Sequence, residues 1–206
     1  MERIPVAQSQ RERLLLAMIE EVAEHGYATV SIAKVVARAN VSRQTFYEEF
    51  AGKEEALFEA CDAMLDRLVE LAGSAYSNGD PWPIKVRLAL RALLEELAAN
   101  PEGARLITLE LPAAGPSAHE RYRQSTARFI PCFHTGREYG GRDGDLPRDT
   151  ELMAVGGAEA IIFDEVAAGR VSRLPTLLPE ILFTVLVPYL GPEQAVEQMR
   201  RAQVEA

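Results

Sequence analysis

The chain of 206 residues contains 48% hydrophobic and 26% charged residues, a composition typical of soluble globular proteins with a sizeable core. Its formal net charge of −9 disfavours a large basic surface. The sequence contains no run of about 20 apolar residues, so we expect no membrane-spanning segment. The polar first residues lack the apolar core of a signal peptide, which predicts a cytoplasmic location. Two isolated cysteines, Cys61 and Cys132, predict reduced structural thiols rather than a disulfide framework or a metal site.

An amphipathic helix is predicted for residues 8–25. Its expected core stripe repeats at helical spacing and consists of Leu15, Ile19, Val22 and Ala23. Gly26 is expected to end this helix, because glycine readily adopts the backbone conformation that follows a helix C-terminus.

The segment from Ser31 to Lys53 predicts two short helices joined by a tight turn. Ser31 is a preferred residue for capping the first of them. The apolar positions of this helix lie three and four residues apart, as on one buried face: Ile32, Val35, Val36 and Ala39. Asn40 follows, and asparagine enters the left-handed backbone region at low cost, which suits a turn between helices.

Ser42 is expected to cap the second short helix, which is predicted for residues 43–50. Phe46 and Phe50 are four residues apart and would face the core together. The polar residues left near the exposed N-terminal end are Arg43, Gln44, Thr45 and Tyr47. A helix N-terminus that carries hydroxyl, amide and guanidinium groups suits phosphates and base edges in a DNA major groove.

The stretch VSRQTFYEEFAGKEEAL resembles the recognition helix and following segment of the TetR family of bacterial transcriptional regulators. The matching residues are Ala39, Val41, Ser42, Thr45, Phe46, Tyr47, Phe50, Lys53, Glu54 and Leu57. The resemblance covers roughly residues 10 to 60, including the EHGYATVS exit of the first helix. The turn residue that is usually glycine in the family is Asn40 here, which the backbone argument tolerates.

The resemblance implies an all-α protein with an N-terminal helix-turn-helix DNA-binding domain and a C-terminal helical domain for effector binding and dimerisation. The expected boundaries are residues 1–52 and 53–206. Arg43, Gln44 and Thr45 are the expected base readers, with Arg43 favouring guanine. The expected phosphate contacts are Ser31, Ser42, Tyr47 and Lys53.

The charge of the first 60 residues does not by itself support DNA binding. This segment has seven basic and ten acidic residues, a net charge of −3. Three of the basic residues, Arg3, Arg11 and Arg13, lie in or before the first helix, whereas Arg43 and Lys53 flank the second short helix. Because screening acts over about 8–10 Å, a small basic face can work beside acidic surface. We therefore expect few phosphate contacts and a weak salt dependence.

The remainder of the chain predicts helices for residues 53–75, 81–99, 100–111, 118–135, 148–168 and 174–190, and a short final helix with a frayed end. The helices at 148–168 and 174–190 have little polar surface, and a helix that is apolar on most sides must be covered on most sides. We interpret them as a four-helix homodimer interface rather than only the core of their own domain. Its expected residues are Leu152, Gly156, Ile162, Phe163, Leu178, Ile181, Leu182 and Val185.

The resemblance also implies a small-molecule pocket among the helices of the second domain. Candidate lining residues combine aromatic walls with a few polar groups: Trp82, Glu110, Tyr122, Phe129, Phe133 and His134. An aromatic stripe on a helix is, however, more often part of the ordinary core than of a pocket.

The resulting functional hypothesis is a DNA-binding transcriptional regulator, a repressor that a small-molecule effector releases from a palindromic operator. The alternative is a helical ligand-binding or interaction protein without operator binding, which the acidic N-terminal domain favours. Catalysis by Cys132 and His134 is disfavoured, since residues two apart on a helix point in different directions. No zinc, nucleotide or hydrolase motif is present, so neither a metal nor a cofactor is expected.

Overall fold

The computed structural model describes residues 9–140 and 146–204, and the regular elements in these ranges are helical, which confirms the predicted all-α fold class. The N-terminal unit contains α1 (Gln10–His25), α2 (Ile32–Ala39) and α3 (Arg43–Glu49). The helical domain contains α4 (Lys53–Ser77), α5 (Trp82–Ala99), α6 (Pro101–Arg105), α7 (Leu111–Ala113), α8 (Pro116–Thr126), α9 (Pro131–Tyr139), α10 (Thr150–Ala167), α11 (Leu178–Leu190) and α12 (Pro192–Val204). Arg3 lies outside the described residues.

Helix α1 begins with a reciprocal cap. The Ser9 hydroxyl accepts from the Glu12 backbone N–H at 3.2 Å, and the Glu12 carboxylate accepts from the Ser9 N–H at 3.1 Å. The predicted core stripe is wrong by one residue at most positions. The buried apolar residues are Leu14, Ala17, Met18 and Val22. The run of three leucines at 14–16 offers two apolar faces, and tertiary packing selects between them.

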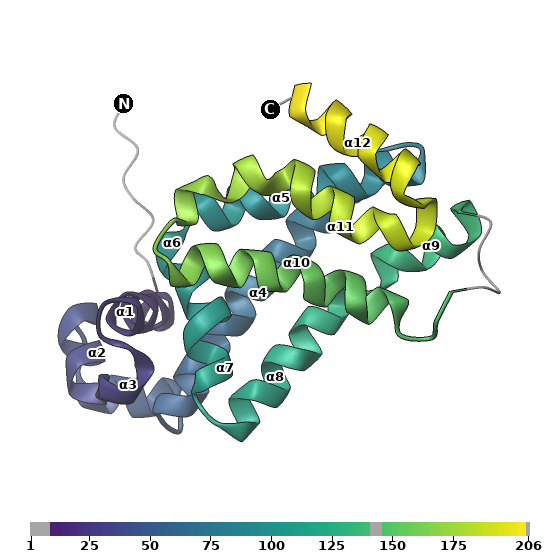
Figure 1. The fold of residues 1–206 in the computed structure, drawn as a ribbon. Helices are drawn as coiled ribbons and strands as arrows, with labels where there is room; N and C mark the ends of the chain where they lie inside the picture. The colour runs from purple at the N-terminus through teal and green to yellow at the C-terminus, as the bar shows by residue number, and fades with distance from the viewer. Residues whose placement is uncertain (1–8, 141–145, 205–206) are drawn as a thin grey trace, which may run out of the picture.

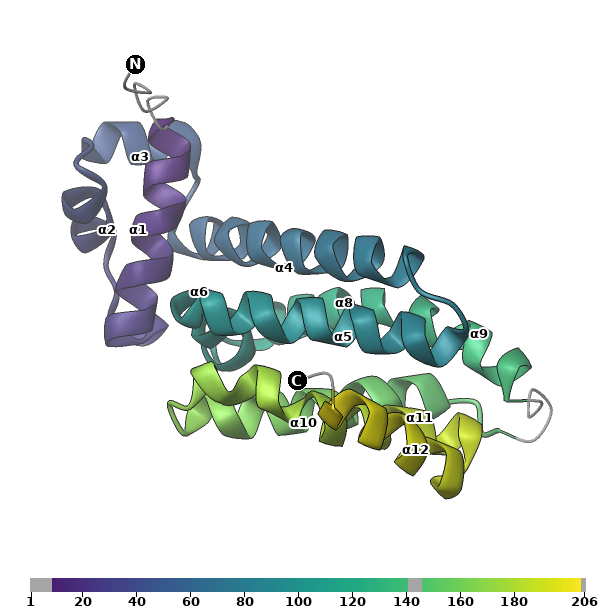
Figure 2. The same ribbon diagram turned by 90° about the horizontal axis from the view of Figure 1, so that it is seen from above.

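The N-terminal unit stands at one end of the molecule, and the long α4 connects it to the helical domain (Figures 1 and 2). Beyond its first turns α4 runs along α5, which lies between α4 and α11 (Figure 2). Helix α12 packs along α11. Ala195 and Ala202 of α12 are completely buried, so the predicted final helix is docked on the domain. The frayed end predicted for it falls on residues 205–206, outside the described residues.

Prolines account for the main differences between predicted and observed boundaries. The helix predicted for residues 118–135 is interrupted, because Pro131 starts a new helix and cannot donate a backbone hydrogen bond to the preceding turn. The helix predicted from residue 174 is a 3₁₀ turn (Val171–Leu177) that contains Pro175, and α11 begins only at Leu178. Between α6 and α7 the chain forms a wide π-helical turn, Leu106–Glu110.

One stretch, Val171–Leu190, is long and apolar enough to cross a membrane by length and composition alone. The expectation that no such stretch exists is therefore corrected. Half of it is buried inside the fold, and the core helix of a soluble protein passes the same test. Three prolines, Pro175, Pro179 and Pro188, lie within it.

The packing of α9 against α5 and α11 depends on the absence of a side chain at Gly136. A Cβ atom at this position would be 2.9 Å from the Tyr189 ring and closer still to the Trp82 ring. Both rings are buried, and the Trp82 indole donates to the Cys132 carbonyl at 3.0 Å, so neither moves freely.

Gly136→Ala is therefore expected to lower the free energy of unfolding by about 1–3 kcal/mol through overpacking. The matched control is Gly73→Ala in α4, where a Cβ would meet nothing within 4 Å and the higher helix propensity of alanine should stabilise by up to about 1 kcal/mol. Equilibrium urea unfolding of both variants measures the difference. Equal effects of the two substitutions would contradict the packing argument.

Candidate functional site

The connection between α2 and α3 has the geometry that the sequence predicts. The Ser31 hydroxyl accepts from the Lys34 N–H at 3.4 Å, and the Ser42 hydroxyl accepts from the Thr45 N–H at 2.9 Å. Asn40 has φ 52° and ψ 50°, the left-handed conformation expected for the turn. Both short helices therefore begin with their free N–H groups capped, and the turn fixes the angle between them.

Helix α3 separates a buried aromatic face from an exposed polar face. Phe46 and Phe50 are buried, with ring centroids 5.5 Å apart. The exposed residues at or near the N-terminal end are Ser42, Arg43, Gln44 and Tyr47, and Thr45 is partly exposed. The polar N-terminal end of α3 is thus free to meet an external partner.

Two of these side chains have contacts within α3. The Arg43 guanidinium lies 5.8 Å from the centre of the Tyr47 ring, and the Gln44 amide donates to the Glu48 carboxylate at 2.9 Å. Both contacts are at the surface, where water competes, so we expect them to be exchanged readily for contacts with a ligand.

Several arginines near the N-terminal unit are engaged inside the protein. Arg11 of α1 pairs with Glu49 at the end of α3 and with Glu59 of α4, and its guanidinium lies 4.7 Å from the Phe50 ring centre. Arg11 thus joins three helices, and this pairing raises its pKa.

Arg38 of α2 is bound in the same way to the acidic surface of α1. Its guanidinium donates to Glu21 at 2.7 Å and to Glu24 at 2.6 Å and 2.9 Å. Glu21, Glu24 and His25 place potential ligand atoms within 4.8 Å of one another, but Arg38 already compensates both carboxylates. The excess acidic charge counted from the sequence is therefore partly neutralised on the side of α1.

Lys53, at the start of α4, is held by its own chain. Its ammonium donates to the carbonyls of Tyr27 and Val30, both at 3.0 Å, and lies 4.1 Å from the Tyr27 ring centre. These contacts show a structural role in fixing α4 to the loop after α1. The predicted phosphate contact of Lys53 stays a prediction.

Lys34 is a further candidate for a phosphate contact, which the sequence analysis did not identify. It lies in the first turn of α2, it is exposed, and across residues 9–140 and 146–204 neither Lys34 nor Arg43 forms an ion pair. Its position three residues after the Ser31 cap, on the solvent side of α2, could have predicted this exposure from the sequence.

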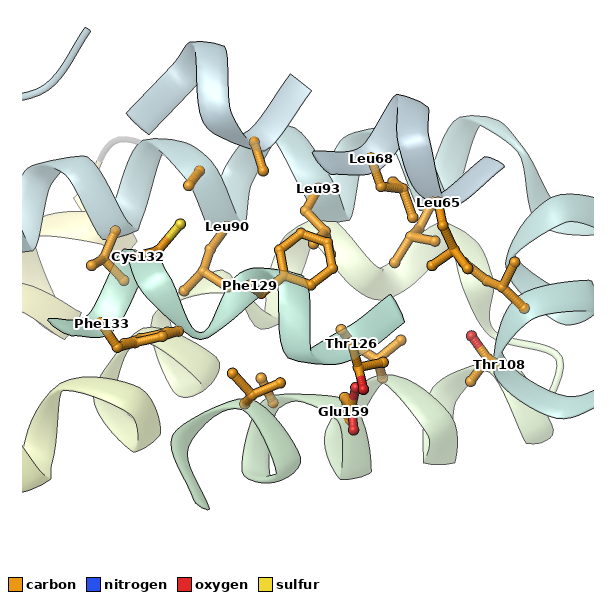
Figure 3. Close-up of a pocket in the computed structure, with 18 of the residues that line it drawn as sticks. Leu65, Leu68, Leu90, Leu93, Thr108, Thr126, Phe129, Cys132, Phe133 and Glu159 are labelled. Atoms are coloured by element: carbon orange, nitrogen blue, oxygen red, sulfur yellow. The ribbon is translucent and has the colours of Figure 1, made fainter. Parts of the chain in front are cut away.

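A cavity of about 120 Å³ lies inside the helical domain. Most of its wall is aliphatic and aromatic, with residues from α4, α5, the π-helical turn, α8, α9 and α10 (Figure 3). Of the six pocket residues predicted from the sequence, Tyr122, Phe129 and Phe133 line it. The polar groups of the lining belong to Thr108, Tyr122, Thr126, Cys132 and Glu159.

The other three predicted pocket residues lie outside this cavity. Trp82 is buried elsewhere, between Tyr139 and Tyr189. His134 is exposed, because the break at Pro131 changes the direction of the helix that carries it. Glu110 is directed toward the N-terminal unit, where its carboxylate accepts from the Tyr27 N–H at 3.0 Å and from Arg105 at 3.2 Å.

Cys132 and Glu159 are cavity residues with titratable side chains, and the pKa of each is shifted. Burial raises the pKa of the Cys132 thiol, which keeps it protonated and a poor nucleophile. Burial also raises the pKa of the Glu159 carboxyl, and hydrogen bonds from Thr126 and Tyr122 oppose that shift only in part. In Figure 3 the oxygens of Thr126 and Glu159 lie next to one another.

The residues predicted for a dimer interface divide into two groups. Leu178, Ile181, Leu182 and Val185 of α11 are at most 2% exposed and form core within one subunit, and Ile162 lines the cavity. The prediction of a dimer contact is therefore wrong for these five residues. The four on α11 are covered by α5, α10 and α12 of their own chain. Leu152, Gly156 and Phe163 of α10 do lie at the surface, with Leu152 54% and Phe163 47% exposed.

Comparison with known proteins gives the N-terminal unit a family. Residues 14–61 match the profile of the family described as "Bacterial regulatory proteins, tetR family". The chain is also 31% identical over 100 residues to the transcriptional regulator AcuR of Cereibacter sphaeroides. That alignment covers 47% of this chain and 44% of AcuR, so it spans less than half of the curated relative.

Solved structures share the whole fold at lower identity. The fatty acid degradation regulator FadR from Bacillus halodurans aligns with a TM-score of 0.76 and 21% identity, covering 84% of this chain and 96% of FadR. FadR from Bacillus subtilis, in complex with stearoyl-CoA, aligns with a TM-score of 0.75 and 19% identity, covering 87% of this chain and 97% of that protein. Residues 14–61 therefore match the TetR family of bacterial regulatory proteins, and the chain shares the all-helical fold of the two FadR structures.

Proposed function

We propose that the protein is a DNA-binding transcriptional regulator, a repressor that acts as a homodimer and responds to a small molecule. The observation that carries this proposal is the capped, exposed N-terminal end of α3 next to an unpaired Lys34 and Arg43. The family match supports the DNA-binding role, and the stearoyl-CoA bound to Bacillus subtilis FadR supports a small-molecule effector in this fold.

In the proposed complex each subunit inserts α3 into the major groove of one half-site of a near-palindromic operator. Arg43, Gln44 and Thr45 read base edges, and Arg43 pairs with guanine. The phosphate contacts come from Ser31, Ser42, Lys34, Tyr47 and the remaining donor capacity of Lys53. With so few free cations at the interface, the affinity should fall less steeply with salt than for strongly basic DNA-binding proteins.

Replacement of the proposed base reader tests the DNA-binding role. Arg43→Ala should weaken operator binding by about 1–3 kcal/mol and relax base preference at one position of each half-site. The control is Arg123→Ala, since Arg123 is equally exposed but lies on α8 and pairs with Glu120. Gel shifts with DNA flanking the gene provide the measurement.

Two outcomes of that experiment would count against the proposal. Unchanged affinity and base preference in Arg43→Ala would remove Arg43 from the base-reading face. Absence of any shift with all flanking fragments would favour the alternative, a helical ligand-binding protein without operator binding.

We propose that the exposed apolar face of α10 is the main dimer contact. Leu152, Met153 and Phe163 are 47–70% exposed, and all three large apolar side chains lie on one helix, with Phe163 about three turns beyond Met153. Gly156 lies on the same helix, and a Cβ there would meet nothing within 4 Å, which leaves room for a partner helix. A two-fold DNA-binding protein requires such a contact to place two reading helices on two half-sites.

Phe163→Asp should therefore shift the protein from dimer to monomer at micromolar concentration, because the charge would be buried without a partner. The matched control is Leu16→Asp, which places the same charge at a similarly exposed apolar position (45%) on α1. Sedimentation equilibrium gives the oligomeric state. A monomeric unmodified protein, or a dimer that survives Phe163→Asp, would contradict this interface.

Effector control is proposed to act through two elements that line the cavity and also contact the N-terminal unit. Helix α4 contributes Leu65, Leu68 and Ala72 to the cavity wall, while its first turns pack against α1. A ligand that prefers a different tilt of α4 changes the spacing of the two α3 helices and lowers operator affinity.

The second element is the π-helical turn. Ile107 and Thr108 face the cavity, and Glu110 at the end of the same turn binds the Tyr27 N–H. The extra residue per turn in a π-helix allows these neighbours to point in opposite directions. A ligand that displaces the turn would therefore move the loop between α1 and α2.

Glu110→Gln should alter operator affinity by about 0.5–2 kcal/mol although Glu110 is far from the DNA-facing side of α3, and it should speed hydrogen exchange of the Tyr27 amide. Glu102→Gln is the control, because Glu102 is exposed on α6 and makes no contact with the N-terminal unit among the described hydrogen bonds. Gel shifts and amide exchange measure both effects. Identical behaviour of the two variants would exclude this route.

A further inference from the structure

The cavity wall carries no cationic side chain. Its nineteen lining residues, all within the described part of the chain, include one acidic residue, Glu159, and no lysine, arginine or histidine. Leucine, valine, isoleucine, alanine and phenylalanine make up most of the rest. A ligand with a negative charge would therefore meet no counter-ion inside the cavity, and transfer of an unpaired ion from water is strongly unfavourable.

Three of the five polar lining residues, Tyr122, Thr126 and Glu159, belong to α8 and α10, whereas Thr108 and Cys132 lie toward opposite ends of the cavity (Figure 3). Thr126 of α8 and Glu159 of α10 meet across the cavity wall, and Leu65, Leu68 and Leu93 approach from α4 and α5 (Figure 3). Tyr122 also lines the cavity and interacts with the Glu159 carboxyl. The arrangement offers a ligand one cluster of hydrogen-bonding groups in a wall that is otherwise mostly apolar.

The burial of Glu159 fits a neutral partner. Burial raises the pKa of this carboxyl, so the protein itself disfavours a charge at this position. The Glu159 carboxyl can accept a hydrogen bond from a ligand hydroxyl group in either protonation state, and the neighbouring Thr126 hydroxyl can donate to a ligand carbonyl group.

The size of the cavity limits the ligand. Its volume of about 120 Å³ is similar to that of an engineered protein cavity of roughly 150 Å³ that binds benzene. A body of one ring or an equally compact aliphatic group therefore fits without expansion of the domain.

We propose that the effector of this protein is a small uncharged molecule with a compact apolar body and one hydroxyl or carbonyl group, which binds at the Glu159–Thr126 pair; this inference rests on the regulatory function proposed above. Carboxylates are excluded because the wall has no cation. Amines are disfavoured because an ion pair with Glu159 would place two charges in a mostly apolar cavity, and the desolvation of both opposes it.

Three probes of matched shape test the charge selection: benzyl alcohol, benzoate and benzylamine, titrated into the full chain at pH 7 by calorimetry. Benzyl alcohol should bind roughly tenfold or more tightly than either charged probe. Tighter binding of benzylamine, lost in Glu159→Gln, would overturn the proposal in favour of a cation site. Tighter binding of benzoate would overturn it as well.

The role of Glu159 is tested against toluene, which lacks the hydroxyl group. Glu159→Leu should lower the ratio of benzyl alcohol affinity to toluene affinity by about fivefold, whereas Glu159→Gln keeps the hydrogen bond and should leave the ratio within about twofold. A ratio that is the same in all three proteins would remove Glu159 from the binding site.

Partial filling of the cavity locates the probes. Ala158→Leu and, on the opposite wall, Ala72→Leu should each weaken benzyl alcohol binding by at least about fivefold, provided that circular dichroism shows an unchanged helix content. Undiminished binding in both folded variants would place the probe elsewhere and overturn the proposal.

Gel shifts on the same samples separate this inference from the proposed function. Failure to bind any flanking DNA would contradict the regulator while the probe titrations remain interpretable. Operator binding with no selectivity for the neutral probe would contradict the ligand class and leave the regulator intact.

Discussion

The position of the reading helix depends on a small joint around Tyr27. Its backbone N–H donates to Glu110 of the π-helical turn, and its carbonyl accepts from the Lys53 ammonium, which also lies above its ring. Three segments far apart in the sequence are therefore held at one residue between the N-terminal unit and the helical domain. A backbone group carries both hydrogen bonds, so substitution of the Tyr27 side chain would leave them in place.

Several basic side chains of the N-terminal unit form contacts within the protein and do not extend into solvent. Arg11 and Arg38 are held by acidic residues of neighbouring helices, and Lys53 is held by carbonyls. In the described part of this unit, the exposed basic side chains that form no ion pair are Lys34 and Arg43, in the first turns of α2 and α3. A segment with a net charge of −3 can therefore present two cations at one end, because screening over about 8–10 Å separates them from the acidic surface of α1.

The sequence was sufficient to predict the α2–α3 geometry, because caps and turns depend on a few adjacent residues. Ser31, Asn40 and Ser42 each specify a local backbone state, and the structure has all three. The inner and outer faces of α11 could not be predicted in the same way. This helix is apolar on nearly every side, and the packing of α5, α10 and α12 around it places Ile181 and Val185 in the core of one subunit.

Tyr122, Phe129 and Phe133 line the cavity, although Phe129 and Phe133 lie on either side of the break before Pro131; their contact with an effector stays a prediction. The errors at His134 and Glu110 have a common cause. Each lies close to a departure from regular α-helix, the proline break at Pro131 and the π-helical turn, and such a departure rotates every following side chain. Glu159 was missed since a single glutamate on a helix carries no signal of its burial.

The ion pairs of Arg11 with Glu49 and Glu59 affect how far α3 would move in a regulatory transition. Arg11 joins α1, α3 and α4, so we expect the N-terminal unit to follow a tilt of α4 as one body. Leu68 lies 15 residues along α4 from Lys53, a lever of about 23 Å at 1.5 Å per residue. In the proposed dimer, a tilt of about 5° at the cavity would shift each α3 by about 2 Å. Two α3 helices that move apart would then separate by about 4 Å, more than the 3.4 Å step between base pairs. The operator would then be out of register by a full base pair, although no side chain in the cavity had moved by more than a fraction of its own length.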